Sequence, residues 1–483
     1  MTLEDRRRWW TLPIVSTAQL LVVLDGTIVN IALPSAQEAL GMSDANRHWV
    51  ITAYALAFGG LLLIGGRISG ALGHRRTFTA GLIGFAAASA LGGAAANPGT
   101  LFAARALQGV FAAALAPAAL SLLATTFTEA RERGRAFGVF AAVGAAGSAV
   151  GLILGGLLTQ YASWRWCLYI NVPFAVLAAL GASVVPRDRP ARGRFDVAGA
   201  LLSAGGFASL VYAFNEAESL GWDSPTVIIL LTCAALLLAA FAAVEKRSSR
   251  PLLPLRILLH RARAGAFIAI TLMFVAMFGF YLFMSYYTQA VLGYSPVQAG
   301  LTLIINALAA LVGSTLIAGR LHGRVTPMAL IVPGLAAAAA GMLILTRLTP
   351  QSTDILPLYL APALALTGFG LGCVLPPTAA LATADIQPHD IGASSAAYNA
   401  SQQLGAALGT ALLNTIAASA TASYLATRDT TPAAASVHGY TTALWAAFAI
   451  LVVAACITTP LTWPRTKNET AEQRTAKEPT PLP

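Results

Sequence analysis

The chain has 483 residues, of which 57% are hydrophobic and only 10% are charged, and it carries a net charge of +10. Soluble proteins carry about 25% charged residues, so this composition excludes a soluble protein and indicates one that lies in a membrane. The apolar segments are roughly 20 residues long, the length of a transmembrane helix rather than of a barrel strand. The four cysteines stand singly in apolar segments, without the spacing of a metal site or a disulfide framework.

Fourteen segments are apolar and long enough to cross a bilayer as helices, and the short loops between them leave no soluble domain for a separate active site. Of the 30 Lys and Arg residues, 25 lie in or beside one set of alternate loops and the two termini. The positive-inside rule therefore predicts a multi-pass protein with both termini in the cytoplasm. This placement explains the excess charge by topology and anionic lipid and argues against nucleic acid as a partner. The predicted spans are residues 12–34, 49–68, 77–96, 100–126, 135–159, 167–185, 197–216, 225–244, 264–287, 297–319, 327–347, 356–383, 393–419 and 440–463.

The first span contains the stretch VVLDGTIVNIALP (22–34), in which Asp25 and Asn30 interrupt an apolar segment. Asp25 falls near the middle of the bilayer, where an uncompensated charge costs at least ~2.5–3.5 kcal/mol. A chain tolerates such a group when it faces a protein interior or water and has a function. We therefore expect Asp25 to bind a proton or to meet a cationic substrate, and we predict Asn30 as a further residue of the proton and substrate path.

Arg105 in the fourth span is the charged partner that the sequence offers to Asp25. Arg105 lies about 8 Å and Asp25 about 14 Å from the outer end of its helix. An arginine side chain can bridge this difference in depth. A nearby cation favours the carboxylate and burial favours the protonated acid, so the pair can load and release a proton as the bundle changes shape. The alternative is a static ion pair that fixes helix packing. Gln108 lies on the same helix face as Arg105 and is expected to orient the guanidinium or to contact substrate.

Two glycine-rich segments are predicted to permit conformational change. The turn GALGHRR (70–76) joins spans 2 and 3 in the cytoplasm, and VGAAGSAVGLILGGLL (143–158) places glycines three and four residues apart along span 5. The glycine face of span 5 lets another helix pack closely and slide. The alternative for span 5 is static packing, and the alternative for the arginines of the turn is a topology signal. The predicted gating residues are Gly66, Gly73, Arg75, Arg76, Gly144, Gly147, Gly151 and Gly155.

The chain also repeats itself, because IGGRISGAL (64–72) and IAGRLHGRV (317–325) share one pattern at matching positions in the order of spans. This symmetry predicts an all-α membrane protein of two six-helix pseudo-repeats with a two-helix insertion and a substrate path between the bundles. The connector at 245–263 is expected to be either an interfacial helix or an extended linker. The predicted domains are residues 1–186 for the N-terminal bundle, 187–263 for the basic linkers and inserted pair, 264–464 for the C-terminal bundle, and 465–483 for a disordered cytoplasmic tail.

The second half has no acid at mid-depth, so its polar side chains are the candidates for a pocket there. Aromatic residues crowd span 9, where they either form a stacking surface for flat substrates or pack against lipid and core. The chain contains no phosphate-binding loop, metal cluster, nucleophile elbow or dinucleotide fingerprint. We therefore expect no enzyme, no metal or other cofactor and no ATPase partner, with the proton gradient as the energy source. The predicted pocket residues are Tyr281, Asn306, Asn399 and Gln402.

Several stretches together resemble one family of membrane proteins. The chain is similar to the fourteen-helix drug:proton antiporters of the major facilitator superfamily, from about Trp10 to Thr459. The resemblance implies export of amphipathic or aromatic drugs by alternating access, driven by proton influx, with Asp25 and Arg105 tied to substrate and proton handling. Many members in antibiotic-producing bacteria give self-resistance. The stretches are LDGTIVNIALP (24–34), WVITAYALA (49–57), RALQG (105–109), SWRWCLYINVP (163–173), GW (221–222), GYSPVQAG (293–300) and QQLGAALG (402–409).

Two positions depart from that family's pattern. Gly70 stands where the family usually has Asp in the cytoplasmic turn, so the latch on the outward-open state is expected to be weaker or to use Glu129 or Glu132. Leu152 replaces the proline of the usual Gly-Pro in span 5, so the bend of the antiporter signature is expected to be absent.

The residues and the resemblance together predict a proton-coupled efflux transporter of the bacterial cytoplasmic membrane that serves antibiotic resistance or natural-product export. Its partners are an amphipathic small molecule, protons and membrane lipid, and one mid-depth acid predicts about one proton per cycle. One alternative is a facilitator or importer of a small solute on the same fold. A second is a polytopic membrane enzyme or sensor, which should carry clustered acids or histidines at a membrane face, and the sequence has none.

Overall fold

The computed structural model describes residues 3–43, 46, 49–186, 196–248, 251–349, 354–428 and 430–463. Regular structure in these ranges is helical apart from an isolated bridge between His322 and Val325, which confirms the prediction of an all-α protein. The predicted basic linker at 187–194 and the predicted tail at 465–483 lie outside the described residues.

The helices of the first half pack around α4. This helix begins at Pro98 because the Asn97 side chain accepts the Thr100 N–H at 2.9 Å and proline suits the first helical turn. α4 lies against α1, α2 and α3, and α1 also packs along α5. The helices are α1 (Leu3–Leu40), α2 (Trp49–Leu72), α3 (His74–Gly93), α4 (Pro98–Thr126), α5 (Ala130–Tyr161), α6 (Trp166–Tyr169) and α7 (Asn171–Gly181).

The helices of the second half form a matching group. α12 begins with a capping box, in which Ser295 and Gln298 satisfy each other's backbone N–H groups. Three π-helical stretches widen these helices locally. The elements are α11 (Arg261–Tyr286), η1 (Tyr287–Val291), α12 (Pro296–Leu311), η2 (Val312–Ala318), α13 (Gly319–Leu321), α14 (Met328–Leu345), η3 (Leu356–Leu360), α15 (Ala361–Ala382), η4 (Pro388–Asp390), α16 (Ile391–Thr427) and α17 (Pro432–Thr462).

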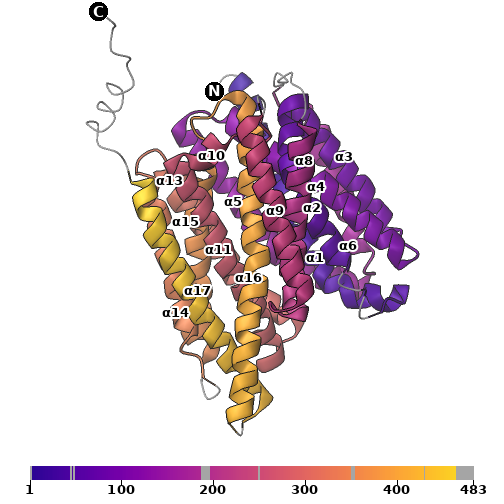
Figure 1. The fold of residues 1–483 in the computed structure, drawn as a ribbon, viewed down its shortest axis with the longest axis vertical. Helices are drawn as coiled ribbons and strands as arrows, with labels where there is room; N and C mark the ends of the chain where they lie inside the picture. The colour runs from indigo at the N-terminus through magenta and orange to yellow at the C-terminus, as the bar shows by residue number, and fades with distance from the viewer. Residues whose placement is uncertain are drawn as a thin grey trace, which may run out of the picture.

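Two further long helices, α8 (Val197–Leu220) and α9 (Pro225–Arg247), lie between these groups in the chain and pack on each other. α8 contacts α2 of the first half and α16 of the second. Asn215 donates to the Thr52 hydroxyl at 2.6 Å, and the Trp222 indole donates to the Thr415 hydroxyl at 3.0 Å. The inserted pair is therefore attached to both halves (Figure 1).

The connector after α9 begins with a turn that is held by hydrogen bonds to a glutamate. The buried Glu245 carboxylate accepts the N–H groups of Leu252 and Leu253, each at 2.9 Å. A helix of five residues follows, α10 (Leu255–Leu259). The described part of 245–263 thus combines features of both predicted forms, because a turn comes first and a short helix follows.

Eleven helices within the described ranges are long and apolar enough to cross a membrane. They match eleven of the predicted spans, and α3, α5 and the short α6 and α7 stand where the other three are predicted. Several helices run past the predicted bounds; α1, for example, begins at Leu3 rather than at 12. The excess turns at this end are polar, so an apolar criterion misses them.

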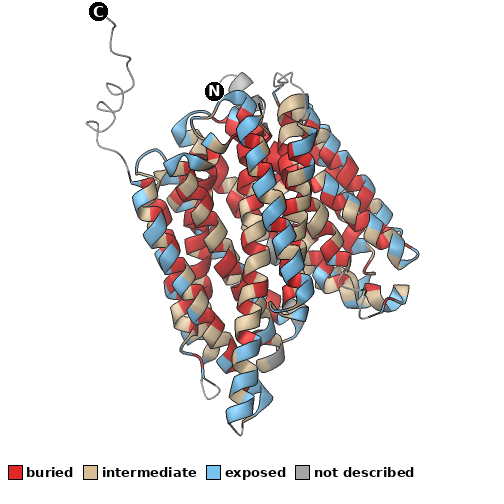
Figure 2. Cartoon of the chain, in the orientation of Figure 1, coloured by how far each residue is buried: buried red, intermediate tan, exposed pale blue. Residues whose placement is uncertain are grey.

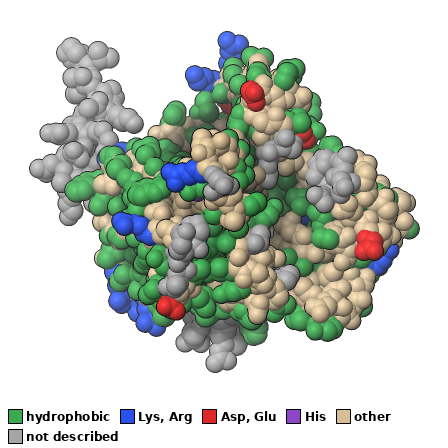
Figure 3. Space-filling view, turned by 90° about the horizontal axis from the view of Figure 1, so that it is seen from below, with side chains coloured by type: hydrophobic (Ala, Val, Ile, Leu, Met, Phe, Trp, Pro, Cys, Tyr) green, Lys and Arg blue, Asp and Glu red, His purple; other side chains and the backbone are tan. Residues whose placement is uncertain are grey.

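The two halves touch at the end of the molecule that carries both termini (Figure 1). A Cβ added to Gly66 of α2 would lie 2.4 Å from the carbonyl oxygen of Gly392 of α16, so these backbones are in contact. A Cβ on Gly138 of α5 would likewise lie 2.5 Å from the carbonyl oxygen of Ser314. Figure 3 looks at the opposite end, where the surface is hollowed.

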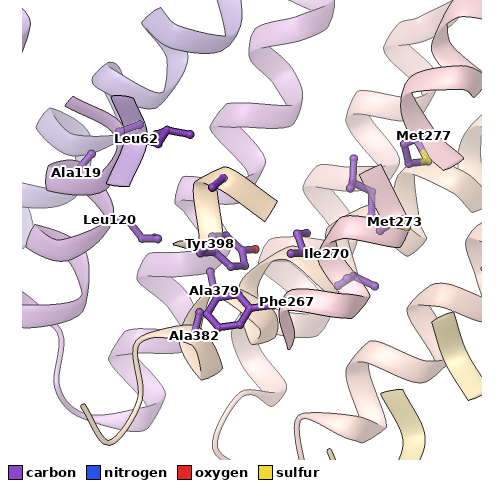
Figure 4. Packing of buried hydrophobic residues seen from close by; sticks show 14 of the residues in the cluster. Leu62, Ala119, Leu120, Phe267, Ile270, Met273, Met277, Ala379, Ala382 and Tyr398 are labelled. Atoms are coloured by element: carbon purple, nitrogen blue, oxygen red, sulfur yellow. The ribbon is translucent and has the colours of Figure 1, made fainter. Parts of the chain in front are cut away.

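A shared apolar core holds the closed end together. Buried residues concentrate inside the bundles and exposed ones on the outer faces (Figure 2). One buried cluster includes Leu120 of α4, Ala379 of α15 and Tyr398 of α16, which Figure 4 shows packed in the same region. The core is therefore continuous between the two halves.

Candidate functional site

Asp25 lies in the middle of α1 and is fully buried. Its Oδ2 accepts a hydrogen bond from Arg105 Nη1 of α4 at 2.5 Å, so the predicted offset between the two helices is bridged. Arg105 is itself only 1% exposed, which makes this ion pair a buried one. Removing one partner of a buried ion pair leaves an uncompensated charge and typically costs about 3–5 kcal/mol.

Gln108 contacts both the guanidinium and the carboxylate. Its Oε1 accepts from Arg105 Nη1 at 2.8 Å, and its Nε2 donates to Asp25 Oδ1 at 3.0 Å. The same amide donates to Ser89 Oγ of α3 at 2.7 Å. Arg105 Nε is held by the carbonyl oxygen of Val50 at 2.9 Å, so α2, α3 and α4 together fix the position of the charged pair.

Sequence reasoning missed Asn171 and Tyr54 at this site. Asn171, the first residue of α7, is fully buried and donates from Nδ2 to Asp25 Oδ1 at 2.9 Å. The Arg105 guanidinium lies over the Tyr54 ring, 4.6 Å from its centroid, which is a cation–π geometry. An amide isolated in the apolar segment 167–185 was the signal that could have identified Asn171.

Asn30, the fourth predicted residue, is not part of this cluster. Its side chain is exposed, and its amide donates to the carbonyl oxygen of Gly26 at 2.9 Å within α1. It lies five positions after Asp25, so on a helix it points to another face. The structure brings together Asp25, Arg105 and Gln108 and leaves Asn30 apart.

The glycines of span 5 form the face on which α1 packs. A Cβ on Gly151 would lie 2.0 Å from the Thr27 hydroxyl, and one on Gly155 would lie 3.1 Å from the Ile28 side chain. Gly144 and Gly147 meet Gln19, Leu20 and Val23 in the same way. The predicted close approach therefore occurs, and its partner is the helix that carries Asp25. α5 is a continuous helix through position 152.

The predicted gating turn lies at the closed end of the molecule. Gly73 has a φ of 96° at the N-cap of α3, a conformation that favours glycine. Gly66 sits at the crossing with α16, whereas Arg75 is half-buried and Arg76 is exposed. A Cβ on Gly70 would lie 3.4 Å from the carbonyl oxygen of His389, so this position also borders the second half.

The expected latch through Glu132 is not what the structure shows. Glu132 pairs with Arg8 of the same half at 2.6 Å, and Glu129 is exposed. An arginine makes the contact between the halves instead, because Arg133 donates to the carbonyl oxygen of Ala380 at 3.1 Å and to the Thr383 hydroxyl at 2.5 Å. These partners lie in the last turn of α15, where unpaired carbonyl groups attract cations.

Another ion pair anchors the start of α16. Arg256 of α10 lies 2.6 Å from the buried carboxylate of Asp390. His322, just after α13, packs on Gly134 of α5, where a Cβ would lie 2.2 Å from its own. Burial lowers the pKa of His322, and the nearby positive charge of Arg133 lowers that pKa further.

The predicted residues of the second half fall into two groups. Tyr281 donates to Asn306 Oδ1 at 2.8 Å, and Asn306 Nδ2 donates in turn to the Thr367 hydroxyl at 2.9 Å. Asn399 and Gln402 lie together on α16, half-buried, with Asn399 donating to the carbonyl oxygen of Ser395 at 2.9 Å. The structure therefore joins Tyr281 to Asn306 by a hydrogen bond, whereas Asn399 and Gln402 lie on another helix, α16.

Comparisons with known proteins agree with this architecture. Residues 15–410 match the Major Facilitator Superfamily. The chain is 55% identical over 458 residues to the puromycin resistance protein pur8 of Streptomyces alboniger, covering 94% of this chain and 91% of the relative. It is 39% identical over 415 residues to the cephamycin export protein CmcT of Amycolatopsis lactamdurans, covering 85% of each.

A solved structure shows the same fold at low identity. The human organic anion transporter MFSD10 (TETRAN) superposes with a TM-score of 0.65 at 15% identity, covering 95% of this chain and 100% of that one. Two groups of helices that meet at one end, a buried ion pair between α1 and α4, and these similarities lead to one conclusion. The chain is a multi-pass membrane transporter and belongs to the major facilitator superfamily.

Proposed function

We propose that the chain is a proton-coupled exporter of amphipathic antibiotics in the cytoplasmic membrane of a bacterium. The observation that carries this proposal is the fully buried Asp25–Arg105 ion pair in a chain that is 55% identical to a puromycin resistance protein. Ionisable groups inside a membrane are costly and mark ion or substrate pathways. The names of the relatives make antibiotics the first substrates to test, beginning with puromycin and cephamycin.

The proposed topology has fourteen spans with both termini in the cytoplasm. Eleven helices qualify by length and apolar composition, and α3, α5 and the α6–α7 pair supply the other three. The basic residues, concentrated beside the termini and alternate loops, support this orientation. The halves touch at the end with the termini, and under this proposed topology that contact is cytoplasmic, as in an outward-facing state. In this proposal residues 1–186 and 264–464 rock against each other.

The charges of the site suggest how protons drive export. Asp25 and Arg105 carry opposite charges, so the pair has no net charge. A proton taken from outside neutralises Asp25 and leaves the guanidinium charge, which the membrane potential favours moving inward by about 2.3 kcal/mol for each 100 mV. Release of the proton to the cytoplasm restores the ion pair, and the transporter returns with its drug. No cofactor or ATPase partner is needed in this cycle.

The substrate path in this proposal runs between the halves. Tyr281 and Asn306 supply a polar group in the second half, and Asn399 and Gln402 supply another on α16. Apolar pockets separate similar molecules by only about 1–3 kcal/mol, so polar groups of this kind are expected to shape which antibiotics are exported. This assignment rests on the hydrogen bond between Tyr281 and the buried Asn306 and on the partial exposure of Asn399 and Gln402.

Purified protein in liposomes loaded with a pH-sensitive dye tests the proposal. Adding puromycin should trigger proton flux, and expression in a susceptible bacterium should raise its puromycin resistance. Substrate movement without proton flux would instead indicate a facilitator on the same fold. A stoichiometry of two or more protons per substrate would contradict a cycle with one mid-depth acid.

A further inference from the structure

The carboxylate of Asp25 is surrounded by hydrogen-bond donors only. Oδ2 accepts from Arg105, and Oδ1 accepts from both Gln108 and Asn171, at distances between 2.5 and 3.0 Å. This arrangement suits the charged carboxylate, because every contact presents an N–H group to an oxygen. It does not suit the protonated acid, whose new O–H needs an acceptor in a buried place.

Two amide oxygens lie close enough to serve as that acceptor, and one of them is already engaged. Gln108 Oε1 accepts from Arg105 at 2.8 Å, while its Nε2 donates to Asp25 and to Ser89. Turning this amide over would break the bond from Arg105 and set its NH₂ group against the guanidinium. Gln108 is therefore fixed as a donor to Asp25 for as long as Arg105 stays in place.

Asn171 differs from Gln108 because its oxygen is unused. The side chain is fully buried, its Nδ2 donates to Asp25, and no group among the described residues donates to its Oδ1. Rotation of this amide by a half turn about its last side-chain bond exchanges Nδ2 and Oδ1. That rotation forfeits no hydrogen bond except the one to Asp25, which it replaces with a bond of opposite direction.

We propose that Asn171 is a positioning residue that follows the protonation of Asp25. When Asp25 is charged, Asn171 Nδ2 donates to Oδ1. When a proton from outside binds Oδ1, the amide turns and Asn171 Oδ1 accepts the new O–H. The proton is the only species that moves between molecules, and it leaves from the same oxygen on the cytoplasmic side. This inference rests on the proposed function, since it takes Asp25 to be the proton carrier.

The surroundings single out this amide as the group that responds. Among the described residues, the charged and titratable groups placed against Asp25 are Arg105 from α4 and Tyr54 from α2, whose ring lies against the guanidinium. Arg105 stays charged throughout. The Tyr54 hydroxyl is also buried without a partner among the described residues, so Tyr54→Phe serves as the competing variant.

The test uses the full-length protein in liposomes with Asn171→Leu, in which leucine has the same branched arrangement of side-chain heavy atoms as asparagine and no polar group. Substrate-triggered proton flux should fall about tenfold or more, while counterflow of labelled puromycin, which needs no net proton transfer, should persist. Asn171→Ser, whose hydroxyl both donates and accepts, should recover part of the flux. Asn215→Leu removes an amide from α8 outside the site and should match the wild type.

Infrared difference spectra between acidic and alkaline buffer give a readout that loss of packing would not change. In the wild type, a side-chain amide C=O band should shift together with the Asp25 carboxylic acid band, and the amide shift should vanish in Asn171→Leu. Unchanged proton flux in Asn171→Leu, an equal loss of flux and counterflow, or an amide shift that survives in Asn171→Leu would overturn the proposal. So would loss of the acid-linked shift in Tyr54→Phe alone.

The same measurements separate this inference from the proposed function. If wild-type protein moves puromycin without proton flux, proton coupling is wrong, and the spectra alone decide whether the amide follows Asp25. A shifting Asn171 band would then still support the switch, and its absence would overturn it.

Discussion

Replacing Gly66 with alanine should shift the transporter away from the state closed at the termini. The added Cβ would lie 2.4 Å both from the carbonyl oxygen of Gly392 and from the Cβ of Ala396, whereas ordinary contact begins near 3.4 Å. α2 and α16 must therefore separate by about 1 Å or more at this crossing. Overpacking of this kind costs about 1–3 kcal/mol, which corresponds to a ~5–150-fold change in the ratio of closed to open molecules.

Distances between spin labels at the exposed positions Leu72 and Gln387 would measure that ratio, in a background without the native cysteines. Gly66→Ala should increase the population with long distances. Gly156→Ala is the matched control, because its Cβ meets nothing within 4 Å, and it should leave the distribution unchanged. An unaltered distribution in Gly66→Ala, or an equal shift in Gly156→Ala, would refute the reasoning.

Three further substitutions test separate parts of the structure. Arg105→Leu should lower the free energy of unfolding by about 3–5 kcal/mol, because it leaves Asp25 unpaired. Thermal unfolding should show that the double variant Arg105→Leu/Asp25→Asn recovers part of this stability. Equal stability of wild type and Arg105→Leu would contradict this. Tyr281→Phe should cost about 1–3 kcal/mol because Asn306 Oδ1 loses its donor, and an unchanged melting temperature would count against that bond. The pKa of His322 is lowered in the closed state, so the neutral imidazole favours that state above the ordinary histidine pKa of about 6.5, and this contribution is lost as the pH falls below it. Label distances in His322→Gln should therefore change less on acidification than in wild type. Identical pH responses would exclude His322 as the source of the pH dependence.

The fold was largely predictable because membrane helices can be recognised by the length of their apolar segments. The short repeat at 64–72 and 317–325 also predicted that Gly66 and its counterpart near Gly319 would occupy related places, and both border the opposite half. The ends of α1 could not be predicted in this way, since its first turns are polar. The attachment of α8 to both halves depends on tertiary contacts that no local pattern records.

The charged pair of the site was predictable because an acid and an arginine in membrane helices have few partners. The side-chain amides of the site were harder to predict. Gln108 could be placed by its spacing from Arg105, whereas Asn171 is 146 positions from Asp25 and reaches it only through the packing of α7. Asn30 lies apart from the Asp25 cluster, because closeness in sequence does not place two residues on one helix face. Glu132 was expected at the interface between the halves, but its carboxylate pairs with Arg8 of α1, in its own half.

The central claim is that Asp25 carries the proton that drives export. Proton flux from liposomes loaded with a pH-sensitive dye, on addition of puromycin, tests it most directly in wild type and Asp25→Asn. Substrate-triggered flux that Asp25→Asn abolishes, while puromycin counterflow persists, is the predicted result. Undiminished flux in Asp25→Asn would contradict it.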